Sequence, residues 1–320
     1  MLDLVRLSPR ALFPPGGKEL YRQIALLTEM DPGDEVLVAA CGSGVTLGYF
    51  VREFEVQGSG VDEDPVLVER AEEWTRKEGV QGRMQVQRSG MDGLPFRDGV
   101  FDITVGELGL TAHADPEEAV KEMIRVTKPG GRMALVQLVW KAPVDTTRRE
   151  VLSRHLGARP LMLVELKRLL RAHGIHRLHT EDWSDDETAF RRTETKPFPD
   201  FAELFSLPEK LGILRRAWGR WGLRGVKTAM KREVEVHRLL TRERILGLDL
   251  IVGRKAETPG DQATGDGPAS DERRDGPDRR KGDSQASKGE GRPKEESEAE
   301  ADRARDQTRD LPLFAPGEEG

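Results

Sequence analysis

Short β-rich runs alternate with helical segments along the first 250 residues, and this alternation restricts the fold more than any other feature. The strands that we expect are residues 35–40, 55–61, 83–88, 101–106, 132–140, 175–180 and 245–252. Helical segments of roughly 10–15 residues separate most of these strands, which is typical of βαβ units. The pattern therefore predicts an α/β fold, a doubly wound, mostly parallel, seven-stranded Rossmann-like sheet with helices on both faces.

Two helix starts are marked by an aspartate followed by proline, at Asp64-Pro65 and Asp115-Pro116. Aspartate is a favourable N-cap, and proline is well tolerated at the first helical position. Further along, Lys128-Pro129-Gly130-Gly131 is expected to form a turn before the fifth strand, and residues 161–172 a helix.

The composition changes sharply near residue 256. From Ala256 to Gly320 the chain has 18 acidic and 11 basic residues, and its only large apolar side chains are Leu311, Leu313 and Phe314. Such a segment cannot bury enough apolar surface to offset the entropy lost on ordering. We therefore predict one folded domain over residues 1–255 and a disordered polar tail over 256–320.

Several classes of protein are disfavoured by composition. The single cysteine, Cys41, excludes a disulfide framework and a zinc site built on cysteine pairs. Apolar runs fall far short of the roughly 18 residues of a membrane span, and the N-terminus lacks the pattern of a signal peptide. Residues 1–255 carry 40 basic and 39 acidic side chains, which gives no strong nucleic-acid signal. We expect a soluble, cytoplasmic protein.

A glycine-rich turn, Ala40-Cys41-Gly42-Ser43-Gly44, follows the first expected strand and leads into a helix. Asp62 ends the second strand, 20 residues after Gly42. An acid in this position can accept hydrogen bonds from the ribose hydroxyls of an adenosine cofactor, whereas the turn alone is weak evidence. A Walker-type phosphate loop is absent, and Leu47 stands where a dinucleotide fingerprint needs its third glycine.

Four stretches of the chain resemble, in order and spacing, the class I S-adenosylmethionine-dependent methyltransferases of the small-molecule type, related to ubiquinone-biosynthesis and sterol methyltransferases. The stretches are VLVAACGSG at 36–44, GVD at 60–62, SGMDGLPF at 89–96 with DGVFD at 98–102, and DP at 115–116 with RVTKPGG at 125–131. The resemblance covers roughly residues 15–182 and 245–255. It implies that the folded domain is a methyltransferase domain and that its cofactor is S-adenosyl-L-methionine.

The resemblance also implies roles for individual residues. The residues implied to contact the cofactor are Ala40, Gly42, Ser43, Gly44, Asp62, Glu63, Met91, Asp92 and Glu107. Glu107 and His113 follow the fourth strand at the edge where ligands of α/β proteins bind, and both are candidates for a catalytic base. For His113, a structural hydrogen bond beside a helix is the competing interpretation. No metal site is expected.

Two positions depart from the resembled family. Val38 stands where the family usually has an acid, and Ala40 where it usually has glycine. The predicted function is transfer of a methyl group from S-adenosylmethionine to a small-molecule acceptor. The alternative is a catalytically weak module that binds S-adenosylmethionine or S-adenosylhomocysteine and acts through its insertion or tail.

The insertion at about 184–244 precedes the last expected strand and is predicted to contain helices at 208–217 and 226–240. From Arg191 to Arg244 it has 14 basic and 7 acidic residues. Trp218 and Trp221 with nearby arginines are predicted to contact an anionic acceptor or a membrane surface, the alternative being a helical cap with a solvated basic face. In the tail, Asp310-Leu311-Pro312-Leu313-Phe314 weakly resembles peptides that dock on bacterial sliding clamps.

Overall fold

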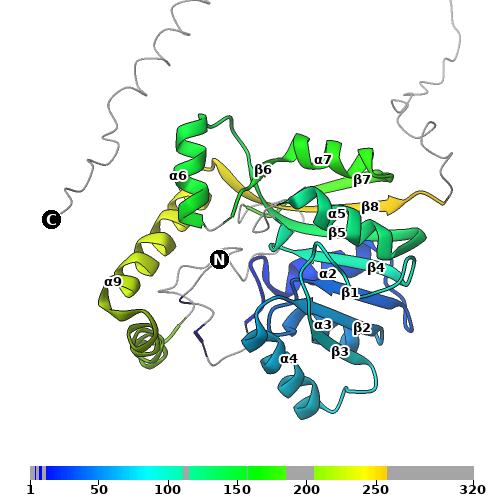
Figure 1. Cartoon of the computed structure of the whole chain (residues 1–320), viewed down its shortest axis with the longest axis horizontal. Helices are drawn as coiled ribbons and strands as arrows, with labels where there is room; N and C mark the ends of the chain where they lie inside the picture. Colours follow the sequence, from blue (N-terminus) through cyan, green and yellow to red (C-terminus); the bar gives the residue numbers. More distant parts are fainter. Residues whose placement is uncertain are drawn as a thin grey trace, which may run out of the picture. The chain divides into compact units, whose positions relative to one another are not determined.

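The computed structural model describes residues 4, 7, 8, 12–110, 115–156, 158–184 and 205–257. Its core is a sheet with the strand order β3-β2-β1-β4-β5-β8-β7, and the short β6 pairs with β5 beside this path (Figure 1). The strands are β1 (Glu35–Ala39), β2 (Gln57–Asp62), β3 (Met84–Arg88), β4 (Phe101–Glu107), β5 (Thr127–Trp140), β6 (Leu161–Met162), β7 (Ile175–Asp182) and β8 (Leu246–Lys255).

Only β8 runs antiparallel to its neighbours β5 and β7, among the strands described. The doubly wound, mostly parallel sheet predicted from the sequence is therefore confirmed, with the two-residue β6 as an additional strand. All the parallel strands end at one edge of the sheet, and the loops at that edge are where ligands of such folds bind.

Helices cover both faces of the sheet. They are α2 (Gly17–Leu27), α3 (Val45–Glu53), α4 (Pro65–Glu78), α5 (Pro116–Val126), α6 (Thr146–Leu156), α7 (Leu163–Ala172) and α9 (Leu207–Thr241). The two predicted N-caps are confirmed, because the Asp64 carboxylate accepts from the N–H of Val66, and that of Asp115 from the N–H groups of Glu117 and Glu118.

Alternate residues of the central strands supply two separate apolar cores. Val36 and Val38 of β1 belong to the core beneath α2 and α3, whereas Leu37 and Ala39 belong to the core beneath α5 and α7. Because helices pack against both faces of β1, both faces are buried, and this explains its continuous apolar sequence.

Three local expectations need correction. The segment Lys128–Gly131 is assigned to β5, but the pairing with β4 jumps from Thr127 to Arg132, so these four residues form an irregularity rather than a separate turn. The helix expected at 161–172 begins at Leu163, because Leu161 and Met162 pair with β5.

The boundary of the predicted tail also moves. The backbone N–H of Ala256 donates to the carbonyl of Gly174 at 3.0 Å, and Glu257 forms an ion pair with Arg254 at 2.9 Å. Ala256 and Glu257 thus belong to the folded body. The remainder of the predicted tail, with its Asp310–Phe314 peptide, lies outside the described residues.

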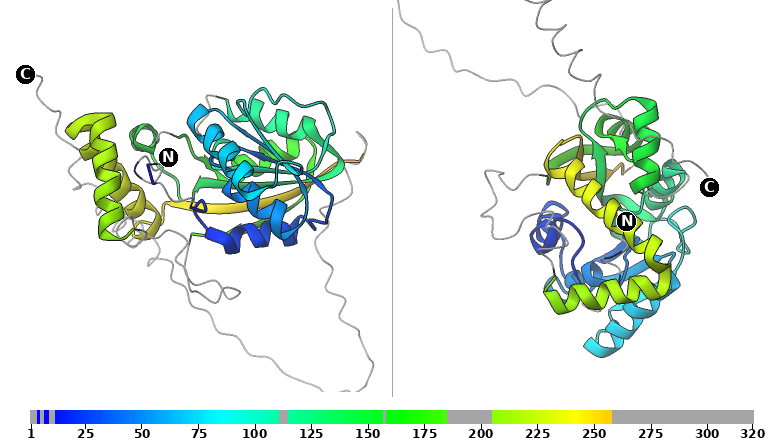
Figure 2. Two further views of the ribbon diagram at one scale, coloured as in Figure 1. Left: turned by 90° about the horizontal axis from the view of Figure 1, so that it is seen from below. Right: turned by 90° about the vertical axis from the view of Figure 1, so that its left-hand side faces the viewer.

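The insertion is described from Phe205 onward. The two helices expected there are present within α9, as two helical segments on either side of Gly222, whose φ of +67° and ψ of 179° are not helical. This helix stands at the edge of the sheet where β8 begins, which is also where the parallel strands end (Figure 2). Among the helices that the structure describes, none has the length and apolar character needed to span a membrane.

Candidate functional site

The glycine-rich turn connects β1 to α3 and has an unusual backbone. Ala40, Gly42 and Gly44 all have positive φ angles, of 59°, 57° and 76°. A Cβ atom on Gly44 would lie 2.9 Å from Cε of Met84 and 3.1 Å from Cβ of Ala71, whereas one on Gly42 would have no atom within 4 Å. Gly44 is thus required for packing, and Gly42 borders open space at the edge where α3 begins.

Asp62 ties the end of β2 to this turn. Its Oδ2 accepts a hydrogen bond from the backbone N–H of Gly42 at 2.9 Å, and its Oδ1 accepts one from the N–H of Asp64 at 2.9 Å. The carboxylate is half-buried. Because a carboxylate has about four acceptor positions, it keeps acceptor capacity for a pair of ligand hydroxyls after making these two bonds.

Glu63 and Asp92 come together around Gly90. A Cβ atom on Gly90 would lie 2.9 Å from Oε1 of Glu63, and it would also crowd Oδ1 of Asp92. Both acids are exposed, whereas Met91, which precedes Asp92 in the chain, is buried in the core beneath α5. The segment that follows β3 therefore lies beside the end of β2, as the predicted cofactor contacts require.

The methyl group of Ala40 fits into the turn because its neighbour after β4 is a glycine. It packs against Gly109, where a Cβ atom would collide with it and would also come within 3.2 Å of Sδ of Met91. The alanine in the turn is therefore matched by a glycine in the segment after β4.

Glu107, the last residue of β4, is buried at the same edge, with 5% of its surface exposed. The pKa of its carboxyl is raised to about 8, mainly by burial and also by the nearby charge of Asp62, although hydrogen bonds with the hydroxyls of Thr46 and Tyr21 lower it. The free carboxyl is therefore largely protonated at neutral pH.

Cys41 is also buried, and its sulfur lies 3.8 Å from the carbonyl oxygen of Gly42. Burial raises the pKa of the thiol well above its usual range, and the carboxylates of Asp62 and Glu107 add to this effect. A protonated thiol is a poor nucleophile, so Cys41 contributes to the turn through its backbone and its packing.

Two further residues predicted for the site, Ser43 and His113, have no contact in the described part of the chain that would assign them a role. Ser43 is half-buried in the turn, and His113 lies outside the described residues. Two residues that sequence reasoning missed, Tyr21 of α2 and Thr46 of α3, are buried close to Glu107. Thr46 could have been noticed because it follows Gly44 by two positions, but no sequence signal points to Tyr21.

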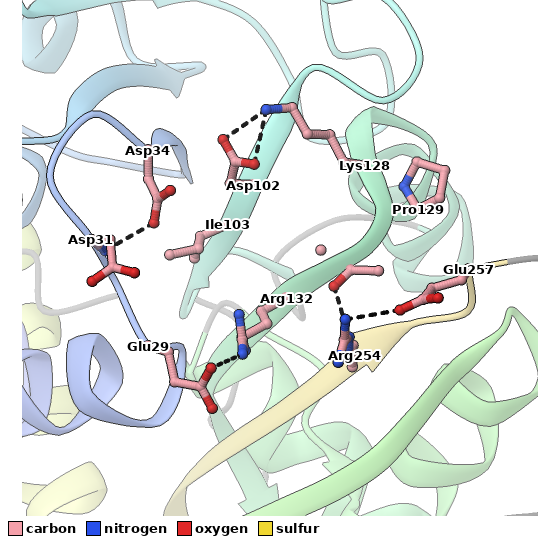
Figure 3. A pocket seen from close by; sticks show the side chains of 12 residues that line it. Glu29, Asp31, Asp34, Asp102, Ile103, Lys128, Pro129, Arg132, Arg254 and Glu257 are labelled. Atoms are coloured by element: carbon pink, nitrogen blue, oxygen red, sulfur yellow. Dashed lines mark hydrogen bonds and ion pairs between the residues drawn. The ribbon is translucent and has the colours of Figure 1, made fainter.

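A separate hollow of about 260 Å³ lies at the opposite edge of the sheet, where the parallel strands begin (Figure 3). Its cations already have anionic partners. Lys128 Nζ lies 2.7 Å from Asp102 Oδ2, Arg254 pairs with Glu257, and Arg132 pairs with Glu29. Among the described residues, the cations of this hollow are therefore not free to bind an anionic ligand, and the turn at the other edge is the better candidate site.

Comparison with known proteins identifies the segment that contains this edge. Residues 36–131, which contain the turn, Asp62, Glu63, Met91, Asp92 and Glu107, match the family model described as "Methyltransferase domain". This segment of the chain is a methyltransferase domain. The chain is similar to the methyltransferase GfsG of Streptomyces halstedii, with 24% identity over 63% of this chain and 74% of that protein.

The methyltransferase domain is also similar to a ubiquinone/menaquinone biosynthesis C-methyltransferase, UbiE, of Idiomarina loihiensis. The two are 30% identical over 37% of this chain and 47% of the relative, so the chain matches about half the length of that protein. Among solved structures, the [4+2]-cyclase SpnF has a TM-score of 0.60 at 22% identity, covering 78% of this chain and 85% of that one. A phosphoethanolamine N-methyltransferase of Haemonchus contortus, solved with S-adenosyl-L-methionine, has a TM-score of 0.57 at 16% identity, covering 76% of this chain and 53% of that one.

The residues at this edge fit S-adenosylmethionine, the cofactor of the methyltransferase domain. The open side of Gly42 leaves room for a ligand, and Asp62 retains acceptor capacity for ribose hydroxyls. The start of α3 directs backbone N–H groups toward the same space.

Proposed function

We propose that this protein transfers the methyl group of S-adenosylmethionine to a small-molecule acceptor. The observation that carries the proposal is the position of Asp62, whose carboxylate is held by the N–H of Gly42 beside the open side of the turn. A charged acceptor at the end of the second strand is suited to the two hydroxyls of a ribose.

S-adenosylmethionine, when bound, supplies an electrophilic methyl group on a sulfonium that is already an excellent leaving group. The task of the chain is then to hold the reactants in line and exclude water. Asp62 would orient the ribose of the cofactor, and Met91 and Asp92 would border its adenine. The backbone of the turn would hold the methionine part of the cofactor. A dedicated base is not needed for an acceptor that is nucleophilic by itself.

The acceptor would enter at the edge where α9 stands. The two tryptophans of α9 differ in their surroundings: Trp218 is 63% exposed, whereas Trp221 packs against the small core that α9 forms with the N-terminal residues. Trp218 is flanked by the exposed Arg215 and Arg220. We assign to this exposed group, rather than to Trp221, the predicted contact with an anionic acceptor, and its charge and ring are suited to that chemistry.

Calorimetry with S-adenosylhomocysteine, S-adenosylmethionine and NAD tests the cofactor. We expect the first two to bind and NAD not to bind. Methyl transfer is then tested by incubating the protein with methyl-labelled S-adenosylmethionine and sets of small phenols, amines and polyketide-like acceptors. Tight binding of NAD, or the absence of binding by both adenosyl compounds, would contradict the proposal.

A further inference from the structure

The helix α9 carries large apolar side chains on its solvent side. In the segment before Gly222 they are Leu207, Leu211 and Trp218, whose exposed fractions are 63% to 74%. Their spacing of four and seven residues places them in one row along the helix, which we call the first row. Single exposed apolar side chains are common, but a row of them indicates a surface that binds a partner.

The segment after Gly222 repeats this arrangement. Leu223, Met230 and Val234 are spaced by seven and four residues and have exposed fractions of 46% to 73%, and we call them the second row. Of the nine large apolar side chains that are exposed in the described part of the chain, six lie on α9. The other three lie singly on α2, α4 and α7, so the exposed apolar surface is concentrated on one helix.

Basic side chains accompany both rows. The helix has nine lysines and arginines and three glutamates, a net charge of +6 in a chain whose net charge is −6. Five of the basic side chains are exposed and have no ion-pair partner among the described residues: Arg215, Arg220, Arg224, Lys227 and Lys231. The three glutamates are half-buried. Lys227 follows Leu223 by four positions, so it lies in line with the second row.

The opposite side of α9 is used for packing. Ile213, Ala217 and Ala229 are buried in a small core with Leu4 and Leu7, and Arg216 Nε donates to the carbonyl oxygen of Leu7 at 2.8 Å. Both segments of the helix lie across the same end of the folded body (Figure 2). Because the inner side is fixed in this way, the two rows and the basic side chains stay available on the outer side.

The combination of apolar rows and positive charge selects the partner. A second copy of this chain would bring two surfaces of net charge +6 together, which is unfavourable. A nucleic acid would pair with the basic side chains but would leave the two apolar rows in water. An anionic lipid surface suits both features, because its headgroups attract lysine and arginine while apolar side chains enter the boundary of the acyl chains.

We propose that α9 docks the protein on an anionic membrane surface. The two rows enter the lipid, and the five exposed basic side chains lie against the headgroups. The helix stands at the edge of the sheet where the parallel strands end, so docking brings this edge to the membrane. The anionic acceptor proposed for Trp218 would then be amphipathic and would reach the site from the lipid. That consequence rests on the proposed function, whereas docking itself does not.

Co-sedimentation of the full chain with lipid vesicles tests docking. We expect binding to vesicles of equal parts phosphatidylcholine and phosphatidylglycerol at low salt, and binding to pure phosphatidylcholine vesicles that is weaker by about tenfold or more. Leu211→Gln with Leu223→Gln should weaken binding to the anionic vesicles about tenfold or more, because two leucines no longer enter the lipid. Lys227→Gln with Lys231→Gln should also weaken it about tenfold or more and should reduce its dependence on salt.

Matched changes elsewhere on the surface are the controls. Leu26→Gln with Val164→Gln removes two similarly exposed apolar side chains from α2 and α7, and Arg76→Gln with Lys77→Gln removes two exposed charges from α4. Both control variants should bind the anionic vesicles within about twofold of the wild type, because isolated surface side chains form no docking surface. Affinity for S-adenosylhomocysteine without lipid should be unchanged in all four variants. Absence of that affinity in the wild type would contradict the proposed function and not docking.

Failure of the full chain to bind the anionic vesicles would overturn the inference, and so would equal losses in the α9 variants and their controls. Two further outcomes would overturn it as well. Weaker binding in the lysine variant alone, with normal binding in the leucine variant, would mean that α9 attracts polyanions in general, nucleic acids included, without entering lipid. A dimer in light scattering that dissociates in the leucine variant would make the rows an interface between two copies of the chain.

Discussion

The carboxylate of Asp62 accepts a hydrogen bond from the backbone N–H of Gly42 at a distance of 2.9 Å. This bond joins the end of β2 to the turn after β1, so one side chain both shapes the turn and faces the space beside it. Stability and ligand binding are therefore coupled at Asp62, and its substitutions should affect both.

Replacement of Asp62 by alanine is expected to weaken S-adenosylhomocysteine binding by about 1.5–3 kcal/mol, because two ribose hydroxyls lose a charged acceptor. The free energy of unfolding should fall as well, by about 1 kcal/mol, since the N–H of Gly42 loses its partner. Calorimetry and urea unfolding measure the two effects. Asp34→Ala, at the opposite edge of the sheet, is the control, and equal binding losses in both variants would remove Asp62 from the site.

The two glycines of the turn should respond differently to alanine. Gly44→Ala places a methyl group 2.9 Å from Met84 and 3.1 Å from Ala71, so it should reduce the free energy of unfolding by about 2 kcal/mol. Gly42→Ala meets no protein atom within 4 Å and should cost only about 1 kcal/mol of backbone strain. Its methyl group projects into the proposed cofactor space, however, so binding should weaken at least tenfold in calorimetry. A Gly42→Ala protein with normal affinity would place the cofactor elsewhere.

A buried ion pair between Lys141 and Asp249 should make the free energy of unfolding depend on pH. Lys141 Nζ contacts the carboxylate of Asp249, which is fully buried in β8, and lies 2.9 Å from Asp182 Oδ2. Burial raises the pKa of Asp249, and the ammonium group of Lys141 opposes this shift. Lys141→Met should therefore leave an uncompensated buried carboxylate and cost about 3 kcal/mol at neutral pH.

The sign of the pH effect follows from the raised pKa of Asp249. A group whose pKa is higher in the folded protein favours folding when protonated, and this contribution is lost as the pH rises through the folded-state pKa. Without Lys141 that pKa rises further, so the deficit of Lys141→Met should be smaller at about pH 5 than at about pH 8. Urea unfolding at both pH values measures it, with Lys121→Met, on the exposed side of α5, as the control. A deficit independent of pH would show that Asp249 does not change its charge between these two pH values.

Substitutions of the two tryptophans of α9 should have different effects, because one side chain packs in a core and the other is exposed. Trp221→Ala removes part of the small core that includes Ile213 and Ala217, and should cost about 1–2 kcal/mol of unfolding free energy. Trp218→Ala should change that free energy by less than about 0.5 kcal/mol, because Trp218 is 63% exposed.

Turnover of an anionic acceptor should instead fall in Trp218→Ala, with cofactor affinity within about twofold of the wild type. Thermal melting, calorimetry and a methyl-transfer assay compare the variants, and sedimentation with anionic vesicles detects contact with a membrane surface. Normal turnover in Trp218→Ala would assign the exposed indole no role in acceptor binding.

Local patterns were sufficient to predict the sheet, the capped helices that begin at Pro65 and Pro116, and the turn with Asp62. Each of these depends on a short-range rule: strand and helix periodicity, the hydrogen bonds of an N-cap, and the backbone freedom of glycine. The spacing between Gly42 and Asp62 follows from one βαβ unit, so the sequence by itself determined that these residues meet.

Only the tertiary structure decided the surroundings of Glu107. Its carboxyl is buried with Tyr21 and Thr46 because three elements pack on one face of the sheet, and the strand order brings β4 beside β1. The same holds for Asp249, which meets Lys141 through the antiparallel pairing of β8 with β5. Burial and charge pairing arise between segments far apart in the chain, and these set the pKa values on which the chemistry depends.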